Sequence, residues 1–546
     1  MRRNTRCAIL LAGLMVFFCA FGLGQATAET GRSHPIAILY TSDVHCAVSE
    51  NIGYAGLSAY KERLLDEGYE VFLVDSGDAI QGAAIGSFSE GESIIELMNA
   101  LGYTAMTLGN HEFDYGGPAR VEELSELAEF PFVCVNFRET KTGESVYPGY
   151  CLVESDGVKI AFVGVSTPAT LSSSTPIYFM DEQGEWAYDF LADGTGEALW
   201  SAVQNAVDKA RAAGADYVFA LTHLGVGAAL SPYTSSELIA HTTGIDAVLD
   251  GHSHSVLASE QVKNKDGDWV LLSATGTKLE NIGLLTIDPD GTLTTQLISD
   301  FEQRDAEVTA LIEAIESEYA EKLNAVVAHL EAPLTIDDPA TGARIIRNAE
   351  TNLGDLCADA YRAAGDADIA FVNGGGIRAS LPAGEITYGD VLAVQPYGNL
   401  LCKVEVTGQV ILDALEFGAY VVPEENGGFL QVSGLTYEIH PEIPSSVRVD
   451  ENGMFVSVDG AYRVQNVQVA GEPLDLSRTY TLVSHNYMLK NFGDGYTMFE
   501  DCTMLMDEFL LDVDALTDYL NGAYAENADL YSDPYGEGRI LAVYGD

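Results

Sequence analysis

The sequence predicts an α/β fold, and three observations carry this prediction. Short apolar runs of the kind that form buried parallel strands recur along the first half of the chain, and each is followed by polar residues. The second half has its own apolar run, which leads into a glycine-rich loop. At 546 residues the chain is long enough for two or three domains, each with its own core.

Five apolar runs in the first half predict strands, at residues 36–41, 71–76, 105–108, 217–222 and 247–250. Parallel strands deliver their carboxyl ends to one edge of a sheet, where α/β folds build their sites. We therefore expect seven oxygen and nitrogen ligands from the segments after these runs to converge at one place. The expected ligands are Asp43, His45, Asp78, Asn110, His223, His252 and His254.

These residue types suit a pair of divalent cations. Two ions roughly 3.5–4 Å apart can clamp a phosphoryl oxygen and neutralise charge on the attacking and leaving oxygens. Mixed imidazole and carboxylate ligands favour Zn, Mn or Co over Mg or Ca. Asp43 and His45, two residues apart on an extended stretch, point the same way and can grip one ion together, and His252 and His254 repeat this spacing. Asp78 follows a glycine that allows a tight turn, and it is the natural bridging carboxylate.

Each segment taken alone also has an ordinary structural interpretation that involves no metal. A single Asp-x-His pair more often lies on the surface, and Gly-Asp is mostly a turn. The Gly251-His252-Ser253-His254 segment is more specific, because two histidines after a buried strand are costly unless they are ligated or hydrogen-bonded. Gly109-Asn110-His111-Glu112-Phe113-Asp114 after a strand is highly specific. Because all of these segments occur together and in the right order along the chain, chance is a poor explanation, and they predict a two-metal phosphoesterase site.

With these segments the chain resembles the calcineurin-like metallophosphoesterases and, over its whole mature length, the secreted 5′-nucleotidase family. The resemblance implies an N-terminal four-layer metallophosphoesterase β-sandwich flanked by helices, joined by a helix to a C-terminal α/β substrate-binding domain. It implies that the first metal is held by Asp43, His45, Asp78 and His254, and the second by Asp78, Asn110, His223 and His252. It also implies that His111 contacts the phosphate and stabilises the transition state, and that Asp114 orients His111 and favours its cationic form.

One segment indicates where the two halves of the chain are joined. Apolar residues recur at helical spacing between residues 305 and 323, with acids between them, which is typical of a surface helix. The resemblance adds that such a helix joins the two halves and lets the C-terminal domain rotate. We expect a signal peptide at 1–28, a catalytic domain at 33–300, a linker region at 301–333 and a substrate-binding domain at 334–546.

The second half carries a candidate phosphate and nucleoside pocket. Residues 373–378, Asn-Gly-Gly-Gly-Ile-Arg, follow the predicted strand 369–372, so that backbone amides can approach a ligand closely and Arg378 can fork onto a phosphate. The resemblance implies a base sandwiched between two rings and a ribose held by a carboxylate. The implied substrate-binding residues are Arg344, Arg347, Asn373, Arg378, Tyr397, Asn399, Gly434, Tyr487 and Asp494.

The amino terminus has the pattern of a secretory signal. Arg2, Arg3 and Arg6 precede an apolar run at 8–23 and the small-residue site Ala26-Thr27-Ala28. The run is short for a membrane span, and neither a second long apolar segment nor a C-terminal anchor is evident. We expect an exported, periplasmic or extracellular protein without a stable membrane anchor in the mature chain.

The charge balance is strongly acidic, with 82 acidic and 27 basic residues. Removal of residues 1–28 takes away three arginines and no acids, which leaves 24 basic residues and a net charge of −58. This excludes nucleic-acid polymers and anionic membranes as partners held by general electrostatics. Because a polyanionic surface also repels nucleotides, the site must supply positive charge locally.

Six cysteines remain after residue 28, without a scaffold-like spacing. Export permits disulfides, and Cys134 and Cys151 are a candidate pair. Cys46, beside His45, is more typical of a small buried side chain than of a ligand.

Together these features predict an exported phosphohydrolase with two divalent metal ions (Zn, Mn or Co), which releases phosphate from nucleoside 5′-monophosphates. The same site used on 2′,3′-cyclic nucleotides or nucleotide-sugars is the alternative. A non-catalytic binding protein that retained the fold is a remote alternative, which loss of a ligand or of His111 would favour, and none is lost.

Overall fold

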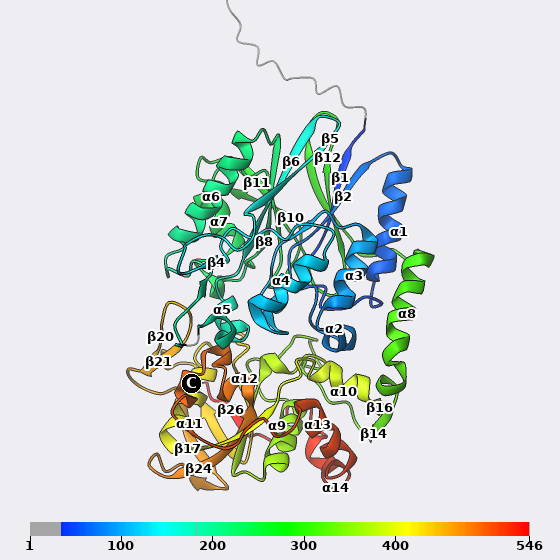
Figure 1. The fold of residues 1–546 in the computed structure, drawn as a ribbon. Coiled ribbons are helices and arrows are strands. Elements are labelled where there is room, and N and C mark those ends of the chain that lie inside the picture. Colours follow the sequence, from blue (N-terminus) through cyan, green and yellow to red (C-terminus); the bar gives the residue numbers. More distant parts are fainter. Residues whose placement is uncertain (1–33, 182, 545–546) are drawn as a thin grey trace, which may run out of the picture.

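The computed structural model describes residues 34–181 and 183–544, so the expected signal peptide lies outside the described residues. The N-terminal strands and helices fill the upper part of Figure 1 and the C-terminal elements fill the lower part. The long helix α8 (Ala306–Leu323) runs along one side between them.

Two sheets form the centre of the N-terminal half. The first has the order β13 (Leu293–Ile298), β12 (Ile282–Ile287), β1 (Ile36–Thr41), β2 (Glu70–Asp75) and β3 (Ala105–Met106), with β1, β2 and β3 parallel. The second has the order β10 (Val256–Lys263), β11 (Trp269–Thr275), β9 (Ala247–Asp250), β8 (Tyr217–His223), β6 (Val158–Ser166) and β5 (Tyr150–Ser155), with β6, β8, β9 and β11 parallel. A small ribbon, β4 (Arg138–Glu139) with β7 (Tyr188–Asp189), lies outside them.

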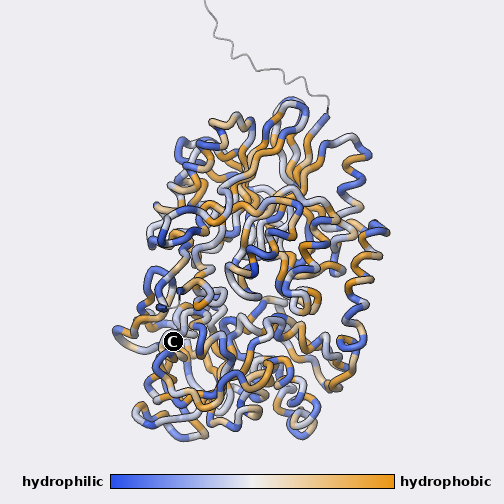
Figure 2. The backbone as a smooth tube through the Cα atoms, in the orientation of Figure 1, coloured by the Kyte–Doolittle hydropathy of each residue, from blue (hydrophilic) through white to orange (hydrophobic). Residues whose placement is uncertain are grey.

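Side-chain alternation along β1 explains how these sheets pack. Ile36, Ile38 and Tyr40 join a core with residues of β6, β8 and β9, whereas Ala37 and Leu39 join the core beneath the helices. The first sheet is covered by α1 (Gly53–Asp66), α3 (Glu92–Leu101) and α4 (Gly117–Leu127), and the second by α6 (Glu197–Ala212) and α7 (Ser235–His241). The implied four-layer architecture is confirmed, and the apolar strands lie inside it (Figure 2).

The predicted joint is a helix. The side chain of Asp305 caps α8 by accepting from the amides of Glu307 and Val308. Val308, Ile312 and Ile315 then pack on the N-terminal core, as the helical spacing predicted. Farther along α8, Tyr319 stacks on Phe88 of α2 (Ala84–Ser89) with ring centroids 4.8 Å apart.

The C-terminal half has a mixed sheet with helices on both sides. Its order is β18 (Leu430–Ser433), β15 (Ile369–Asn373), β24 (Thr479–His485), β17 (Leu401–Thr407) and β25 (Thr503–Met506). One core lies against α9 (Asn352–Gly365), α10 (Tyr388–Val394) and α13 (Asp512–Asn521), and the other against α11 (Gly408–Gly418). A smaller sheet has the order β23 (Glu472–Pro473), β22 (Val464–Val469), β19 (Leu435–Ile439) and β26 (Ile540–Ala542). Two further pairs are β14 (Val326–Leu330) with β16 (Gly384–Thr387), and β20 (Val447–Val449) with β21 (Phe455–Val458).

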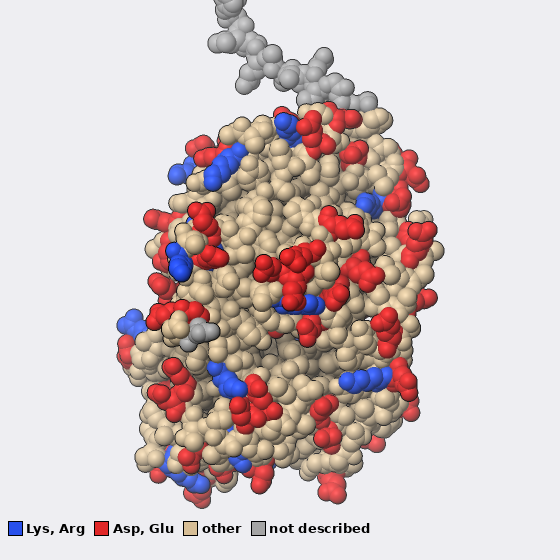
Figure 3. Space-filling model, in the orientation of Figure 1, with Lys and Arg blue, Asp and Glu red and all other residues tan. Residues whose placement is uncertain are grey.

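Three global features bear on the predictions. All six cysteines of the described residues are free, so the candidate pairing of Cys134 with Cys151 is wrong in this structure, and Cys46 is buried. Acidic side chains are spread over the face shown in Figure 3, with few basic ones between them. Within residues 34–544, apart from residue 182, we find no helix with the length and apolar character needed to span a bilayer.

Candidate active site

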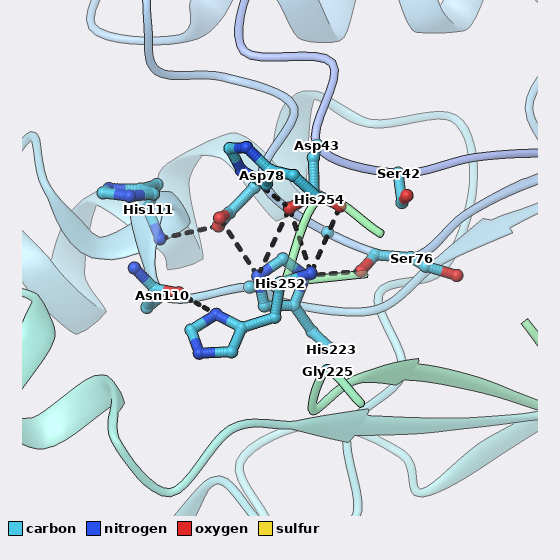
Figure 4. Close-up of polar contacts among 12 residues, drawn as sticks. Ser42, Asp43, Ser76, Asp78, Asn110, His111, His223, Gly225, His252 and His254 are labelled. Atoms are coloured by element: carbon cyan, nitrogen blue, oxygen red, sulfur yellow. Dashed lines mark hydrogen bonds and ion pairs between the residues drawn. The ribbon is translucent and has the colours of Figure 1, made fainter. Parts of the chain in front are cut away.

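The seven expected ligands meet where two sheets, and not one, present their strand ends. Asp43 and His45 follow β1, Asp78 follows β2, and Asn110 follows β3, all in the first sheet. The remaining ligands come from the second sheet, where His223 is the last residue of β8 and His252 and His254 follow β9. Figure 4 shows the Asp43, Asp78, His223 and His254 side chains pointing toward one another, with the Asn110–His252 pair beside them. The expected convergence is present, but it depends on the packing of two sheets.

Two groups of side chains can each hold a metal ion. The ligand atoms of Asp43, His45 and His254 lie within 4.8 Å of one another, and so do those of Asp43, Asp78 and His223. The Nε2 atoms of His45 and His254 are 3.2 Å apart, and the Nε2 of His223 is 3.0 Å from Oδ2 of Asp78. Asp43 belongs to both groups, which places the two candidate ion positions side by side. Asp78 also reaches both, because its Oδ2 lies 3.9 Å from Nε2 of His45 and 3.0 Å from Nε2 of His223.

Asn110 and His252 form the outer edge of the second group. The Nδ1 of His252 lies 3.1 Å from Oδ1 of Asn110. The backbone amide of His252 donates to Oδ1 of Asp43 at 3.0 Å, which connects the loop after β9 to the loop after β1. The contact brings side chains from the ends of β3 and β9 together across the two sheets.

The backbone at the ligands is held in an uncommon conformation. Asp43, His45, Asp78, His252 and His254 all have positive φ, at 50°, 47°, 59°, 77° and 50°. Non-glycine residues rarely adopt this region, and such outliers gather at functional sites. The expected extended stretch is therefore wrong: both ligand pairs lie on loops that turn sharply after their strands, and these turns bring both members of each pair to the same place.

The ring nitrogens fit metal binding. The Nδ1 of His45 is 3.0 Å from the Gln81 carbonyl, and the Nδ1 of His223 is 2.7 Å from the Ser76 carbonyl. A carbonyl accepts only from a protonated nitrogen, so Nε2 of each ring keeps a lone pair for an ion. Burial lowers the pKa of His252 to about 3, and it also lowers the pKa of His45, where the charge of Arg378 acts in the same direction. His223 differs from these two rings: burial would lower its pKa, but the carboxylates of Asp78 and Asp43 reverse this effect and raise it to about 10. An ion bound at Nε2 of His223 would therefore take the place of a proton between this ring and the two carboxylates.

A buried glutamate organises the loops that carry these ligands. The Glu112 carboxylate accepts from the amides of Asp78 at 2.9 Å, Ala79 at 2.8 Å and Gly109 at 2.6 Å. It thereby joins the loop after β2 to the loop after β3. The sequence placed Glu112 inside a specific motif without giving it a role, because these three amides come together only in the fold.

His111 stands at the edge of the cluster as a hydrogen-bonded pair with Asp114. Its Nδ1 is 2.5 Å from Oδ2 of Asp114, and its backbone amide donates to Oδ1 of Asp78 at 2.8 Å. Burial alone would lower the pKa of His111, but the carboxylates of Asp114 and Asp78 reverse this effect and raise it. The arrangement favours a cationic ring beside a site for an anion.

Arginines and Tyr397 from the C-terminal half face this site. The rings of Tyr397 and His111 have centroids 6.0 Å apart, across the two halves of the chain. Burial lowers the pKa of Arg347 to about 9, and the positive charges of Arg344 and Arg378 act in the same direction. The Arg344 side chain is turned onto Glu425, with N–O distances of 3.0 and 2.5 Å.

Asp494 lies at the centre of the predicted nucleoside pocket. Its Oδ2 accepts from the Asn373 side chain at 2.6 Å, and its Oδ1 accepts from the Tyr487 hydroxyl at 3.2 Å. His485 contacts Oδ1 of Asn373 at 2.9 Å and fixes the direction of that amide. Burial raises the pKa of Asp494 to about 6.

Gly434 lies away from the predicted pocket, and the backbone of Asn399 is held by a helix of the C-terminal half. Gly434 follows the carboxyl end of β18, which pairs with Ala370, and a Cβ added there would meet the Asp368 carbonyl. The pocket residue Asn373 pairs with Leu430 at the opposite end of β18. Gly427 and Gly428, just before that opposite end, instead approach Asp494. Asn399 is engaged by α13, because its carbonyl accepts from the Asp512 amide at 2.9 Å.

Comparison with known proteins matches both halves of the chain. Residues 36–256 match the model for calcineurin-like phosphoesterases, and residues 300–501 match the model for the 5′-nucleotidase C-terminal domain. The 5′-nucleotidase of Vibrio parahaemolyticus is 26% identical, with 92% of each chain covered. Protein UshA of Escherichia coli is 24% identical, with 96% of this chain and 98% of that protein covered. The trifunctional nucleotide phosphoesterase YfkN of Bacillus subtilis is 27% identical over 93% of this chain, which spans only 35% of that longer protein.

Solved structures match the same two-domain arrangement. The crystal structure of the 5′-nucleotidase precursor from Thermus thermophilus has a TM-score of 0.77 and 27% identity, and the match covers 93% of this chain and 99% of that one. The sulfate thiohydrolase SoxB of Thermus thermophilus, at 19% identity and a TM-score of 0.67, shares the fold.

Proposed function

Because the chain belongs to the calcineurin-like phosphoesterases that carry a 5′-nucleotidase C-terminal domain, we propose that it releases phosphate from nucleoside 5′-monophosphates. The contact between His111 and Tyr397, 6.0 Å between ring centroids, is the observation that carries the proposal. It joins the metal site of one domain to the pocket of the other, so that one molecule with a phosphate and a base can reach both. We assign the catalytic domain to residues 33–300, the linker to 301–333 and the substrate domain to 334–546.

The N-terminal residues hold the phosphate and the ions. In our assignment Asp43, His45, Asp78 and His254 bind one divalent ion, and Asp78, Asn110, His223 and His252 bind the other. When bound, the ions neutralise phosphate charge and lower the pKa of water, with Zn, Mn or Co as candidates. His111 donates from its cationic ring to a phosphate oxygen, where it stabilises charge that develops in the transition state. Asp114 holds the ring in that orientation through the 2.5 Å contact.

The C-terminal residues bind the rest of the nucleotide. Arg347 and Arg378 face the phosphate, and they supply the local positive charge that a chain with a net charge of −55 needs near its site. Tyr397 and Tyr487 stack on the base, and Asp494 accepts from the ribose hydroxyls. Asn373 and His485 keep the Asp494 carboxylate in place.

We infer that the protein is exported, from the signal pattern in residues 1–28. A substrate that crosses membranes poorly would then be cleaved outside the cytoplasm, which suits the scavenging of phosphate and nucleosides. Fractionation of cells that express the full chain tests this point. Recovery of the whole chain, uncleaved, in the cytoplasm would contradict it.

A panel of substrates tests the proposed activity. Phosphate release is measured with AMP, UMP, UDP-glucose, a 2′,3′-cyclic nucleotide and a small aryl phosphate, each with Mn, Co or Zn added. We expect the highest kcat/KM with a nucleoside 5′-monophosphate and loss of activity after chelation. A higher kcat/KM with the cyclic nucleotide or UDP-glucose would assign the same site to diesters or nucleotide-sugars. Absence of metal-dependent hydrolysis of every substrate would leave only a binding role.

A further inference from the structure

A serine completes the hydrogen bonding of the His111–Asp114 pair. The Ser174 hydroxyl donates to Oδ1 of Asp114 at 3.1 Å, while Oδ2 of the same carboxylate faces Nδ1 of His111. Ser174 is buried, with an exposed fraction of 1%. Each oxygen of Asp114 therefore has its own partner, and the plane of the carboxylate is fixed by both. A carboxylate fixed at two points holds an imidazole more rigidly than one fixed only by the ring.

Ser174 also follows directly the segment that touches the other domain. The short helix α5 (Thr170–Ser173) precedes it, and the Ser174 amide donates to the Thr170 carbonyl at 3.1 Å. From the C-terminal domain, the Tyr487 hydroxyl lies 3.4 Å from the Ser173 carbonyl and 3.5 Å from the Ser172 carbonyl. One short segment thus contacts both the His111–Asp114 pair and a residue of the nucleoside pocket.

The Tyr487 hydroxyl has one proton and several acceptors in reach. Besides the two carbonyls of α5, it lies 3.2 Å from Oδ1 of Asp494, whose amide donates back to it at 3.0 Å. In the proposed function, the ribose hydroxyls donate to Asp494. A ribose that occupies Oδ1 would displace the Tyr487 hydroxyl from that oxygen and leave its proton for the Ser173 carbonyl. Substrate binding would thereby strengthen the contact between the domains.

We propose that Ser174 is a positioning residue for His111, and that the Tyr487 hydroxyl couples ribose binding to it through the α5 segment. The coupling rests on the proposed function, whereas the positioning role rests only on the contacts of Ser174. A connected path runs from Asp494 through the Tyr487 hydroxyl, the Ser173 carbonyl and Ser174 to Asp114 and His111. No sequence pattern indicates this path, because residues 172–174 and Tyr487 are about three hundred positions apart and meet only between the domains.

The first experiment tests positioning with single variants. Ser174→Ala removes the hydroxyl, and Ser174→Thr retains it. Ser125→Ala is the control, because that hydroxyl donates to the Glu122 carbonyl and accepts from the Tyr147 hydroxyl, both of which are distinct from the His111–Asp114 pair. We expect Ser174→Ala to lower kcat about tenfold for both AMP and an aryl phosphate, with KM and metal content unchanged, as for loss of a hydrogen bond to a charged group. We expect Ser174→Thr to restore most of the loss, and thermal unfolding to confirm that each variant is folded.

An unchanged kcat in folded Ser174→Ala, or an equal loss in Ser174→Thr, would overturn the positioning role. A rise in KM alone would also overturn it, because a residue that orients His111 acts on the chemical step. The aryl phosphate makes this test independent of nucleotide binding.

The second experiment tests coupling with a double-mutant cycle. Tyr487→Phe keeps the ring but removes the hydroxyl, and we expect it to lower kcat for AMP about threefold while the aryl phosphate changes less. In the Ser174→Ala background, we expect the same change to alter kcat for AMP by less than about twofold, because the path is already broken. Fully additive losses would overturn the coupling. A wild-type protein that cleaves the aryl phosphate but no nucleotide would overturn the proposed function and the coupling together, and would leave the result for Ser174 standing.

Discussion

The metal-binding loops and the nucleotide pocket are built in different ways. Six of the seven expected metal ligands sit on turns after strands and His223 ends β8, and five of the seven have a backbone with positive φ that fixes the direction of the side chain. The pocket residues come from more varied elements: Asn373 ends β15, Tyr487 lies in the short helix α12 (Asn486–Leu489), and of these only Asp494 has positive φ. Several carry long side chains with alternative partners, such as Arg344 on Glu425 and Tyr487 on both Asp494 and α5. The chemistry is therefore fixed by the backbone, whereas the choice of substrate depends on side chains that can change partners.

This difference predicts a large effect for any change at the metal site. Asp78→Asn removes a charge that lies 3.0 Å from His223 and also anchors the His111 amide. We expect metal content and turnover to fall together, by about a thousandfold in kcat, because the loss affects both the ions and His111. Metal analysis by mass spectrometry, together with phosphate release, measures the two effects. A variant with two tightly bound ions and normal turnover would show that Asp78 is not the bridging ligand.

His111 separates chemistry from metal binding within the same domain. His111→Ala should lower kcat by about 10²–10³, which is typical of the loss of one strong donor to a developing negative charge. Both ions should stay bound, because Nδ1 of His111 is engaged by Asp114 and His111 is not among the seven assigned ligands. Steady-state kinetics with metal analysis checks this result. Loss of an ion in this variant would make His111 a ligand instead.

The same contrast explains what could be predicted from the sequence. The predicted strands 36–41 and 247–250 match β1 and β9, because strands buried on both faces leave continuous apolar runs. The metal ligands could be predicted as well, because they are close in sequence to the ends of such strands. The role of Glu112 could not be predicted, since it depends on amides from two loops.

The pocket was predicted less completely, for a physical reason. The hydrogen bond between Asn373 and Asp494 agrees with a shared pocket, but Gly434 lies at the wrong end of β18 for a contact with Asn373. Loop residues take their positions from tertiary contacts, and a motif does not contain these contacts. Gly427 and Gly428 carried a usable pattern, a glycine pair just before a strand, that predicts close approach of the backbone to a neighbour.

Tyr397 tests whether the pocket governs substrate choice. One good stacking contact on a base is worth roughly 1–3 kcal/mol, so Tyr397→Ala should lower kcat/KM for AMP by about ten- to a hundredfold. Hydrolysis of a small aryl phosphate should change far less, because that substrate does not extend to the base site. Parallel kinetics on the two substrates check this expectation. Equal losses would mean that Tyr397 mainly supports His111, whose ring centroid lies 6.0 Å away.

The smallest effect is expected at the rim, where Arg344 and Glu425 pair with exposed fractions of 32% and 38%. Ion pairs this exposed contribute only about 0–1 kcal/mol to stability, so Glu425→Gln should leave thermal unfolding almost unchanged. It should free Arg344 to turn toward a bound phosphate and remove a repulsive charge, which lowers KM for AMP about two- to fivefold with kcat unchanged. The gain should shrink as salt is added, because the charges involved are close to solvent. Arg344→Ala in the same background should cancel the gain. A raised KM in Glu425→Gln would instead mean that the pair holds the loop at Gly427 and Gly428 in place, and the pocket would then be as dependent on its backbone as the metal site.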